Sequence, residues 1–228
     1  MLKQETEWIG AKLLALNVEA LSPMLDIGSS TLTFRTQQKP YIHSKLFGPL
    51  EARGVKVIYA DLKTGDGIDI TADLLSDAGY QEIKALGVQS ILCCNVLEHV
   101  LDPAIFVRRC YALLPCGGRM IITVPKSYPH HRDPIDTGFR PDPEEILALF
   151  DAPVEVEARD IIDTGSYRDD LKARPWIITR QLFRLPFPFL GWTKWKRSMK
   201  KFYWMVRPYR QSCVIIRKPP SPDSPSSR

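Results

Sequence analysis

The 228-residue sequence lacks the cysteine patterns of a redox, zinc-binding or disulfide-bonded domain. Its five cysteines form no C-x-x-C pair and belong to no His/Cys cluster at zinc spacing; they are Cys93, Cys94, Cys110, Cys116 and Cys213. An odd number of cysteines without a framework favours reduced thiols in a cytosol. We therefore expect a cytoplasmic protein whose cysteines mostly pack in the core.

Long apolar runs and a signal-peptide pattern are also missing. A membrane-spanning helix needs about 20 consecutive apolar residues, and the N-terminal MLKQETEWIGAKLLALNVEAL reads as a polar amphipathic helix. The composition, 44% hydrophobic and 25% charged, is ordinary for a soluble globular protein with one core. We expect one domain over residues 1–216, with an insertion at about residues 165–211 and a disordered tail over residues 217–228.

Acidic residues are almost absent from the last part of the chain. Residues 1–170 hold 17 Lys/Arg and 25 Asp/Glu, whereas residues 171–228 hold 14 Lys/Arg and one acid, Asp223. The net charge of +5 is therefore the sum of a net charge of −8 over residues 1–170 and a net charge of +13 over residues 171–228. This asymmetry predicts two surfaces with different roles.

Apolar runs alternate with helical patterns, which is typical of an α/β sheet. Strands are expected within residues 23–29, 55–62, 67–74, 88–95 and 119–125, and two late strands within 154–162 and 212–218. Helices are expected at 41–54, ending at Gly54, at 102–118, capped by Asp102 and ended by the Gly117–Gly118 pair, and at 142–150, capped by Asp142. The predicted fold is a Rossmann-like, doubly wound, mostly parallel sheet of seven strands.

The segment LDIGSS, residues 25–30, forms the end of the first expected strand and the turn after it. Gly28 lets the backbone approach a ligand closely. Asp61 closes the second strand, where a carboxylate can accept hydrogen bonds from both hydroxyls of a ribose, and Asp73 follows the third strand. Ligands of open α/β sheets bind beyond the carboxyl ends of the strands, so these acids are expected to converge on one ligand that carries a ribose.

Two further segments, NVLEHV (95–100) and LLPCGGRMIITVP (113–125), complete a pattern that resembles class I S-adenosylmethionine (SAM) methyltransferases. The resemblance covers about residues 20–150 and is strongest to the type 11, UbiE/UbiG-like group. It implies a methyltransferase with SAM as cofactor. It also implies that Asp26, Gly28 and Ser29 line the methionine side of SAM. Asp61 would bind the ribose hydroxyls, Asp73 would lie near the adenine amino group, and Asn95 would sit beside the cofactor.

The sequence departs from this family pattern at two places. Ser30 replaces a glycine, but a SAM loop has no phosphate to cradle and needs no series of glycine amides. Ser30 can line the cofactor site if its backbone avoids positive φ. Asp26 and Asp61 are 35 residues apart, where a Rossmann-like unit has roughly 20. Residues 31–44 are expected to hold the excess as a longer loop, either a lid over the cofactor or a surface insertion.

Histidines are the candidate catalytic groups, because displacement at a methyl sulfonium mainly needs in-line placement and a general base helps a hydroxyl nucleophile. His99 matches the histidine that the family places near the methyl-transfer site; the alternative is a helix-start residue bonded to backbone. His130 and His131 precede Asp133 and Asp136 in the segment HHRDPID, residues 130–136. This segment could deprotonate a hydroxyl, bind substrate or hold a metal, or be only a polar loop pinned by prolines. No metal is expected.

Arg132 and Arg140 could recognise an anionic substrate, although solvated arginines are equally common. The segment NVLEHV lacks the N-P-P-Y or D-P-P-Y pattern of enzymes that methylate nucleobase amino groups. An oxygen nucleophile is therefore favoured, and we expect O-methylation of a hydroxylated small molecule, saccharide or lipid-linked substrate.

Residues 185–210 are basic and aromatic and contain no acid. Apolar residues recur at helical spacing from Trp192 to Val206, with Lys194, Arg197 and Lys201 elsewhere on the helix. Such a helix could pack onto the domain, lie on an anionic membrane surface or bind nucleic acid. The aromatic density favours a membrane surface contacted through residues 181–210 over nucleic acid. The alternatives to the enzyme are a non-catalytic methyltransferase-like scaffold and an RNA methyltransferase.

Overall fold

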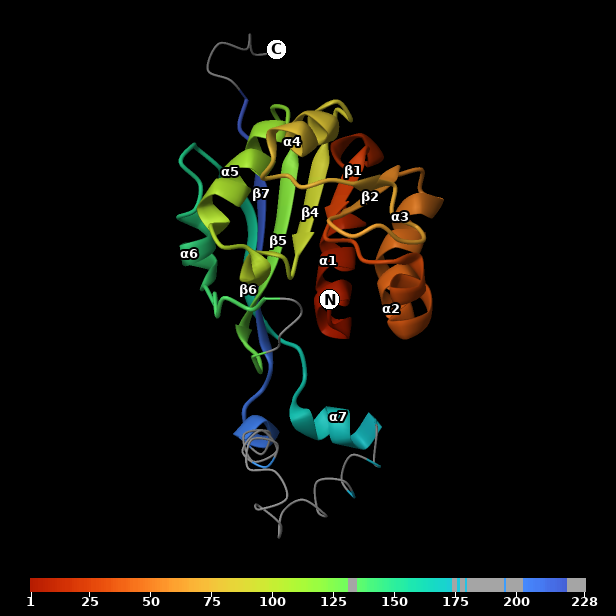
Figure 1. The fold of residues 1–228 in the computed structure, drawn as a ribbon, viewed down its shortest axis with the longest axis vertical. Helices are drawn as coiled ribbons and strands as arrows, with labels where there is room; N and C mark the ends of the chain where they lie inside the picture. Colours follow the sequence, from red (N-terminus) through yellow and green to blue (C-terminus); the bar gives the residue numbers. More distant parts are fainter. Residues whose placement is uncertain (131–134, 174–175, 177–178, 180–194, 196–202, 221–228) are drawn as a thin grey trace.

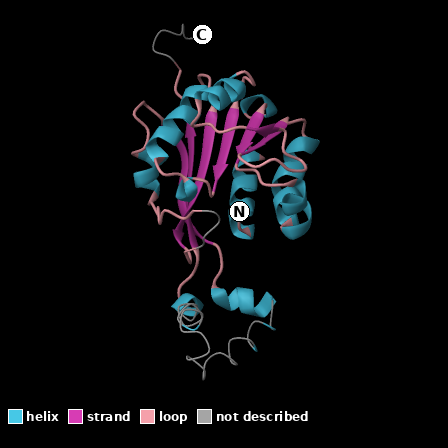
Figure 2. Cartoon of the chain, viewed as in Figure 1, coloured by secondary structure: helices cyan, strands magenta, loops and turns pink. Residues whose placement is uncertain are grey.

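A computed structural model describes residues 1–130, 135–173, 176, 179, 195 and 203–220. In this part of the chain the strands form one seven-stranded sheet in the order β3-β2-β1-β4-β5-β7-β6 (Figures 1 and 2). β7 is antiparallel to both of its neighbours, and the pairs among β1 to β5 are parallel. The predicted Rossmann-like, mostly parallel sheet is confirmed.

The strands agree closely with those expected from the sequence. They are β1 Met24–Ile27, β2 Val57–Asp61, β3 Ile70–Thr71, β4 Ser90–Cys94, β5 Arg119–Ser127, β6 Glu155–Asp163 and β7 Arg210–Arg217. Every residue of β1 and β4 is buried, as in a parallel strand covered on both faces. The strand order reverses between β1 and β4, and the carboxyl ends at such a reversal are where open α/β sheets bind ligands.

Helices cover both faces of the sheet (Figure 2). One face packs against α1 (Lys3–Leu13), α2 (Pro40–Ile42), η3 (His43–Phe47) and α3 (Gly48–Ala52), which contribute Ile9, Leu13, Ile42, Leu46, Phe47 and Leu50 to one core cluster. The other face packs against α4 (Asp77–Lys84), α5 (Pro103–Leu113) and α6 (Pro143–Leu147), through Ile83, Phe106, Val107, Cys110 and Ile146. The five cysteines are free thiols, and all except Cys116 are buried.

The expectation of a long loop over residues 31–44 is wrong. The chain is helical from Leu32 and includes the π-helical segment η2 (Phe34–Gln38). It breaks only at Lys39, before Pro40 starts α2. The helix expected over 41–54 is present as α2, η3 and α3, and Gly54 follows with φ +95°. The additional residues therefore lengthen a helical segment packed on the sheet and do not form an irregular lid.

The helix after β4 ends earlier than the glycine pair predicted. Asp102 caps it, with the Ile105 N–H donating to its carboxylate at 3.0 Å, as expected. The last helical residue is Leu113, because Leu114 is extended (ψ 136°) before Pro115. Gly117 and Gly118 instead pair with Lys218, beyond the end of β7.

Part of the basic insertion lies beyond the end of β6 and the start of β7 (Figure 1). It contains α7 (Tyr167–Ala173) and an aromatic cluster in which the buried Tyr167 and Tyr209 pack with Tyr128, Leu171, Trp204 and Met205. Most of the amphipathic helix expected from Trp192 to Val206 lies outside the described residues, as does the tail from residue 221. In the described part of the chain, no helix is long and apolar enough to cross a membrane.

Candidate functional site

The backbone after β1 forms a tight turn over the end of β2. The N–H groups of Gly28 and Ser29 both donate to the carbonyl of Ala60, at 2.9 and 3.1 Å. Gly28 has φ +74°, and a Cβ at this position would lie 2.8 Å from Cγ2 of Val96. A side chain at residue 28 would therefore meet both backbone strain and a steric clash. Gly28 is itself exposed, as expected for backbone that a ligand can approach.

Ser30 extends this turn toward the acid that ends β2. Its N–H donates to Oδ2 of Asp61 at 2.9 Å, and the Lys63 N–H donates to Oδ1 at 3.0 Å. Ser30 has φ +57°, so the condition that its backbone avoids positive φ is not met. The carboxylate of Asp61 is fixed by one amide on each oxygen, and each oxygen keeps a second lone pair for another donor.

Arg35, on η2, holds the turn from the side. Its guanidinium donates to the carbonyls of Ser29 (3.2 Å), Ser30 (2.6 Å) and Gly67 (2.7 Å). It also lies 3.7 Å from the ring centroid of Tyr59, a cation–π contact. The residue is 2% exposed. The helical segment that includes η2 thus supplies a buried cation that fixes the backbone of Ser29 and Ser30.

Asp26 is buried in β1, next to β2, and its Oδ2 has no hydrogen-bond partner. Burial raises its pKa to about 7, although Arg35 works in the opposite direction, and the nearby Asp61 contributes a smaller rise. A buried carboxylate oxygen without a partner is costly to retain. A donor from a bound ligand would remove that cost.

Asp73 is exposed and organises the turn before α4. Its Oδ1 accepts from the Leu75 N–H at 2.9 Å, and its carbonyl accepts from the hydroxyl of Ser76, the residue that caps α4. Asp26 and Asp61 thus lie on adjacent strands, close enough for their charges to interact. The hydrogen bonds of Asp73 are to its own turn.

Asn95 follows β4 with φ +54° and lies in a hydrogen-bond network that begins at Glu5 on α1. Its side-chain N–H donates to Oε1 of Glu5 at 2.8 Å, and the hydroxyl of Thr123 donates to the same oxygen at 2.5 Å. The side-chain N–H of Gln211 donates to Oδ1 of Asn95 at 3.1 Å. The fully buried Glu5 therefore ties α1 to the end of β4 and to the middle of β5.

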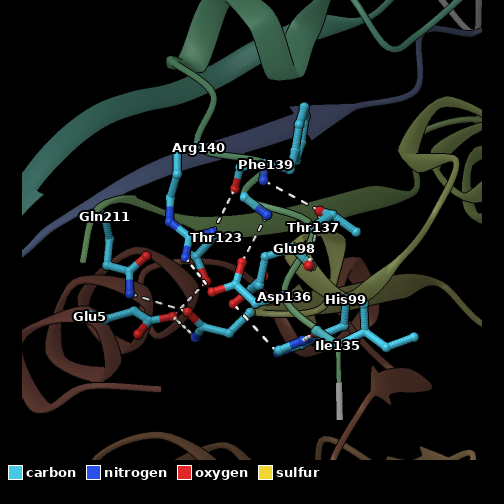
Figure 3. Close-up of polar contacts among 12 residues, drawn as sticks. Glu5, Glu98, His99, Thr123, Ile135, Asp136, Thr137, Phe139, Arg140 and Gln211 are labelled. Atoms are coloured by element: carbon cyan, nitrogen blue, oxygen red, sulfur yellow. Dashed lines mark hydrogen bonds and ion pairs between the residues drawn. The ribbon is translucent and has the colours of Figure 1, made fainter. Parts of the chain in front are cut away.

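His99 is the last residue of the short 3-10 helix η4 (Leu97–His99). This helix directly follows Asn95 and Val96. Its Nδ1 contacts the carbonyl of Ile135, and its Nε2 is 3.9 Å from Oε1 of Glu98 (Figure 3). A carbonyl accepts only, so Nδ1 carries the proton when the ring is neutral. Nε2 is then the basic nitrogen.

Glu98 is fully buried and neither carboxylate oxygen has a hydrogen-bond partner. Burial raises its pKa to about 7, against a lowering by its own backbone N–H and smaller lowerings by Arg140 and the N-terminal ammonium; Glu5 adds a further rise. Its backbone carbonyl accepts from both the N–H (2.9 Å) and the hydroxyl (3.0 Å) of Thr137. The loop after β5 is therefore anchored to η4 at this residue.

The substrate-side candidates of the sequence fall in this same loop. Arg140 donates to Oδ2 of Asp136 at 2.6 Å and to the carbonyl of Phe139 at 2.9 Å. His130 is exposed, with Nε2 3.2 Å from the Asp136 carbonyl. His131 and Asp133, like Arg132, lie outside the described residues. The residues that the structure describes contain no group of three His, Cys, Asp or Glu arranged to hold a metal ion.

Sequence reasoning missed four residues that organise this edge of the sheet: Glu5, Arg35, Glu98 and Gln211. Glu98 lies inside the NVLEHV segment and could have been found by asking how an acid between Leu97 and His99 is satisfied. The other three carry no local signal. They reach the site only because α1, η2 and β7 pack beside the ends of β1, β4 and β5.

No protein-family model and no curated protein sequence matches this chain. Solved structures with the same fold do match. One is phosphoethanolamine N-methyltransferase 2 of Haemonchus contortus in complex with S-adenosyl-L-methionine, at 14% identity and a TM-score of 0.52. That match covers 95% of this chain and 53% of the other, so this chain spans about half of that protein's length.

Two further structures have similar scores. Coclaurine N-methyltransferase, bound to N-methylheliamine and S-adenosylhomocysteine (SAH), matches at 12% identity and a TM-score of 0.51, over 95% of this chain and 70% of the other. The cyclase SpnF matches at 15% identity and a TM-score of 0.50, over 95% of this chain and 81% of the other. At such identities the comparisons establish the fold alone, and chemistry has to be argued from the residues of the site.

Proposed function

We propose that this chain is a SAM-dependent methyltransferase of the type 11 group that methylates an oxygen of a hydroxylated substrate. The observation that carries the proposal is the buried, unpartnered Oδ2 of Asp26 beside the Gly28 turn, at the strand-order reversal. The α-ammonium of SAM is a donor of the kind that this carboxylate lacks. Similar folds bound to SAM or SAH in other proteins support the same choice.

The residues present suit each part of such a cofactor. Asp26, with the backbone of Gly28, Ser29 and Ser30, would hold its amino-acid end. Asp61 would use the second lone pairs of its two oxygens to accept the ribose hydroxyls, while the Ser30 and Lys63 amides keep the carboxylate in place. Asp73 would lie near the adenine amino group, and Asn95 would sit beside the cofactor. When bound, SAM supplies a methyl group activated by its sulfonium.

His99 is the proposed general base. Contact of Nδ1 with the Ile135 carbonyl favours the tautomer in which Nε2 is the basic nitrogen, and Nε2 would take the hydroxyl proton as the oxygen becomes methylated. His130 and His131 are proposed as further acid–base candidates in the same loop, and Asp133, Asp136 and Arg140 as substrate-binding residues. The acceptor that we propose is a hydroxylated small molecule, saccharide or lipid-linked compound.

Titration calorimetry with SAH tests the cofactor, and transfer of labelled methyl from SAM to hydroxylated acceptors tests the reaction. We expect Asp61→Ala to reduce SAH affinity by at least about tenfold, since a bidentate, charge-assisted contact is lost. His99→Asn should abolish transfer while leaving SAH affinity unchanged. SAH binding to wild type without transfer to any acceptor would favour a non-catalytic scaffold, and no SAH binding would refute the proposal.

We propose that residues 181–210 contact the surface of an anionic membrane. Such a contact would bring the site close to a lipid-linked acceptor. The described part of the insertion presents exposed Trp176, Tyr203 and Val206, and aromatic and basic side chains suit a headgroup region. Vesicles containing phosphatidylserine should retain the protein in sedimentation at moderate salt, unlike neutral vesicles. Failure to bind them, with steeply salt-dependent RNA binding, would instead favour an RNA methyltransferase.

A further inference from the structure

Three acceptor atoms at η4 and at the start of β7 are buried and lack hydrogen-bond partners. They are both carboxylate oxygens of Glu98 and Oε1 of Gln211, in side chains that are 0% and 2% exposed. Gln211 donates its own N–H to Asn95 and thereby continues the chain of hydrogen bonds from Glu5. Figure 3 shows Glu98, Glu5 and Gln211 together with the loop residues Asp136 and Arg140.

Within the described residues, neither Arg140 nor His99 donates a hydrogen bond to the Glu98 carboxylate. The Arg140 guanidinium lowers the pKa of Glu98, but it pairs at 2.6 Å with Oδ2 of Asp136, whose side chain is fully buried. Nε2 of His99 is 3.9 Å from Oε1 of Glu98, beyond hydrogen-bonding distance. Glu5 adds a second buried acid to the surroundings of Glu98. Among the described residues, both carboxylate oxygens of Glu98 and Oε1 of Gln211 are thus buried acceptors without a donor.

The fold also fixes the position of this carboxylate. Glu98 lies between Asn95, which the Glu5 network holds, and His99, which the loop contacts at Ile135. Thr137 binds the Glu98 backbone carbonyl with both its N–H and its hydroxyl. A glutamate held by its backbone, with free carboxylate oxygens next to the proposed base, is arranged to receive a ligand.

We propose that Glu98 binds a protonated amine of the methyl acceptor, so that the substrate is an amine-bearing hydroxyl compound such as an amino alcohol or amino sugar. The inference rests on the proposed function. With Oε1 of Glu98 and Nε2 of His99 3.9 Å apart, an ammonium on the first and a neighbouring hydroxyl on the second fit one small molecule. Glu98 is then a specificity residue, and His99 remains the base.

Three probes that share a phenethyl body and differ in the polar end test this site: phenethylamine, phenethyl alcohol and hydrocinnamate, a cation, a neutral molecule and an anion. Binding to the full-length wild type without SAM is measured by ligand-observed NMR titration. We expect phenethylamine to bind at least about tenfold more tightly than the alcohol, the scale of one hydrogen bond between charged groups. Glu98→Gln should abolish that preference. Glu82→Gln, which removes an exposed carboxylate on α4, should keep it.

Wild-type protein that shows no measurable phenethylamine binding, or binds amine and alcohol equally, overturns the inference. So does a Glu98→Gln variant that keeps the preference while its thermal unfolding shows an intact fold. Glu98→Asp retains the charge, so a partly kept preference in that variant supports the proposal even if Glu98→Gln does not fold. Because the probes need no SAM, an amine preference without SAM binding would refute only the proposed function. SAM binding without the preference would refute only this inference.

Discussion

The buried carboxylate of Asp26 gives the sharpest test of the site, through the variant Asp26→Asn. In the folded protein, burial raises the pKa of Asp26 from 3.8 to about 7. The folded state therefore binds this proton more tightly than the unfolded state. Wild-type stability should fall as pH rises through the interval between these two values. Asparagine has nearly the same shape and does not titrate, so the variant escapes this loss.

The magnitude is set by the size of the interval. One pKa unit corresponds to about 1.36 kcal/mol, so the ionised carboxylate costs at most about 4 kcal/mol once the pH exceeds both values. The free energy of unfolding of Asp26→Asn, minus that of wild type, should increase by up to about 4 kcal/mol between roughly pH 4 and pH 8. Glu98 titrates in both proteins and cancels from this difference.

Urea denaturation at a series of pH values, monitored by circular dichroism, measures the difference. Glu82→Gln removes an exposed carboxylate and should match wild type at every pH. Since a ligand that binds only the folded state raises its stability, SAH should stabilise wild type and have little effect on Asp26→Asn. A difference that does not change with pH, or a variant that is less stable than wild type at pH 8, would refute the argument that Asp26 lacks a partner.

Three further substitutions test the framework around the site. Arg35→Lys keeps the positive charge but loses the forked contacts of the guanidinium with three carbonyls. The free energy of unfolding should therefore fall by about 2 to 3 kcal/mol. Titration calorimetry should also show weaker binding of SAH. Gly28→Ala meets positive φ and Val96, so a loss of about 1 to 3 kcal/mol is expected in urea denaturation, and unchanged stability would contradict the described turn. Glu5→Gln replaces one hydrogen-bond acceptor with a donor within a fully buried network. The free energy of unfolding should fall by about 1 to 3 kcal/mol, which is measured as a lower melting temperature. An unchanged melting temperature would show that Glu5 does not anchor α1.

The sequence was sufficient for the order and nature of most elements. Apolar runs as long as a strand, separated by amphipathic segments, specify a parallel sheet covered on both faces, because only buried strands lack a polar side. Capping residues such as Asp102 and Asp142 marked helix starts correctly, since their side chains act on backbone within the same turn. The glycine of LDIGSS indicated the turn after β1 for the same local reason.

Secondary structure predicted from the sequence was wrong where the same local sequence is compatible with two conformations. The excess spacing between Asp26 and Asp61 predicted a loop over residues 31–44. Most of this segment is instead helical, and Arg35 within it contacts the Ser29–Ser30 backbone. Similarly, Gly117 and Gly118 were expected to end α5, but Pro115 ended it first and the glycines pair beside β7.

What the sequence determined by itself is therefore the sheet, its glycine turn and the acids at its strand ends, because these depend on periodicity and on hydrogen bonds within a few residues. The tertiary structure alone decided which side chains meet there. Glu5, Asn95, Thr123 and Gln211 are up to 206 positions apart in the sequence, yet hydrogen bonds join them in one network. Whether a buried carboxylate such as Asp26 or Glu98 has a donor depends on elements distant in the chain, and no local pattern records that.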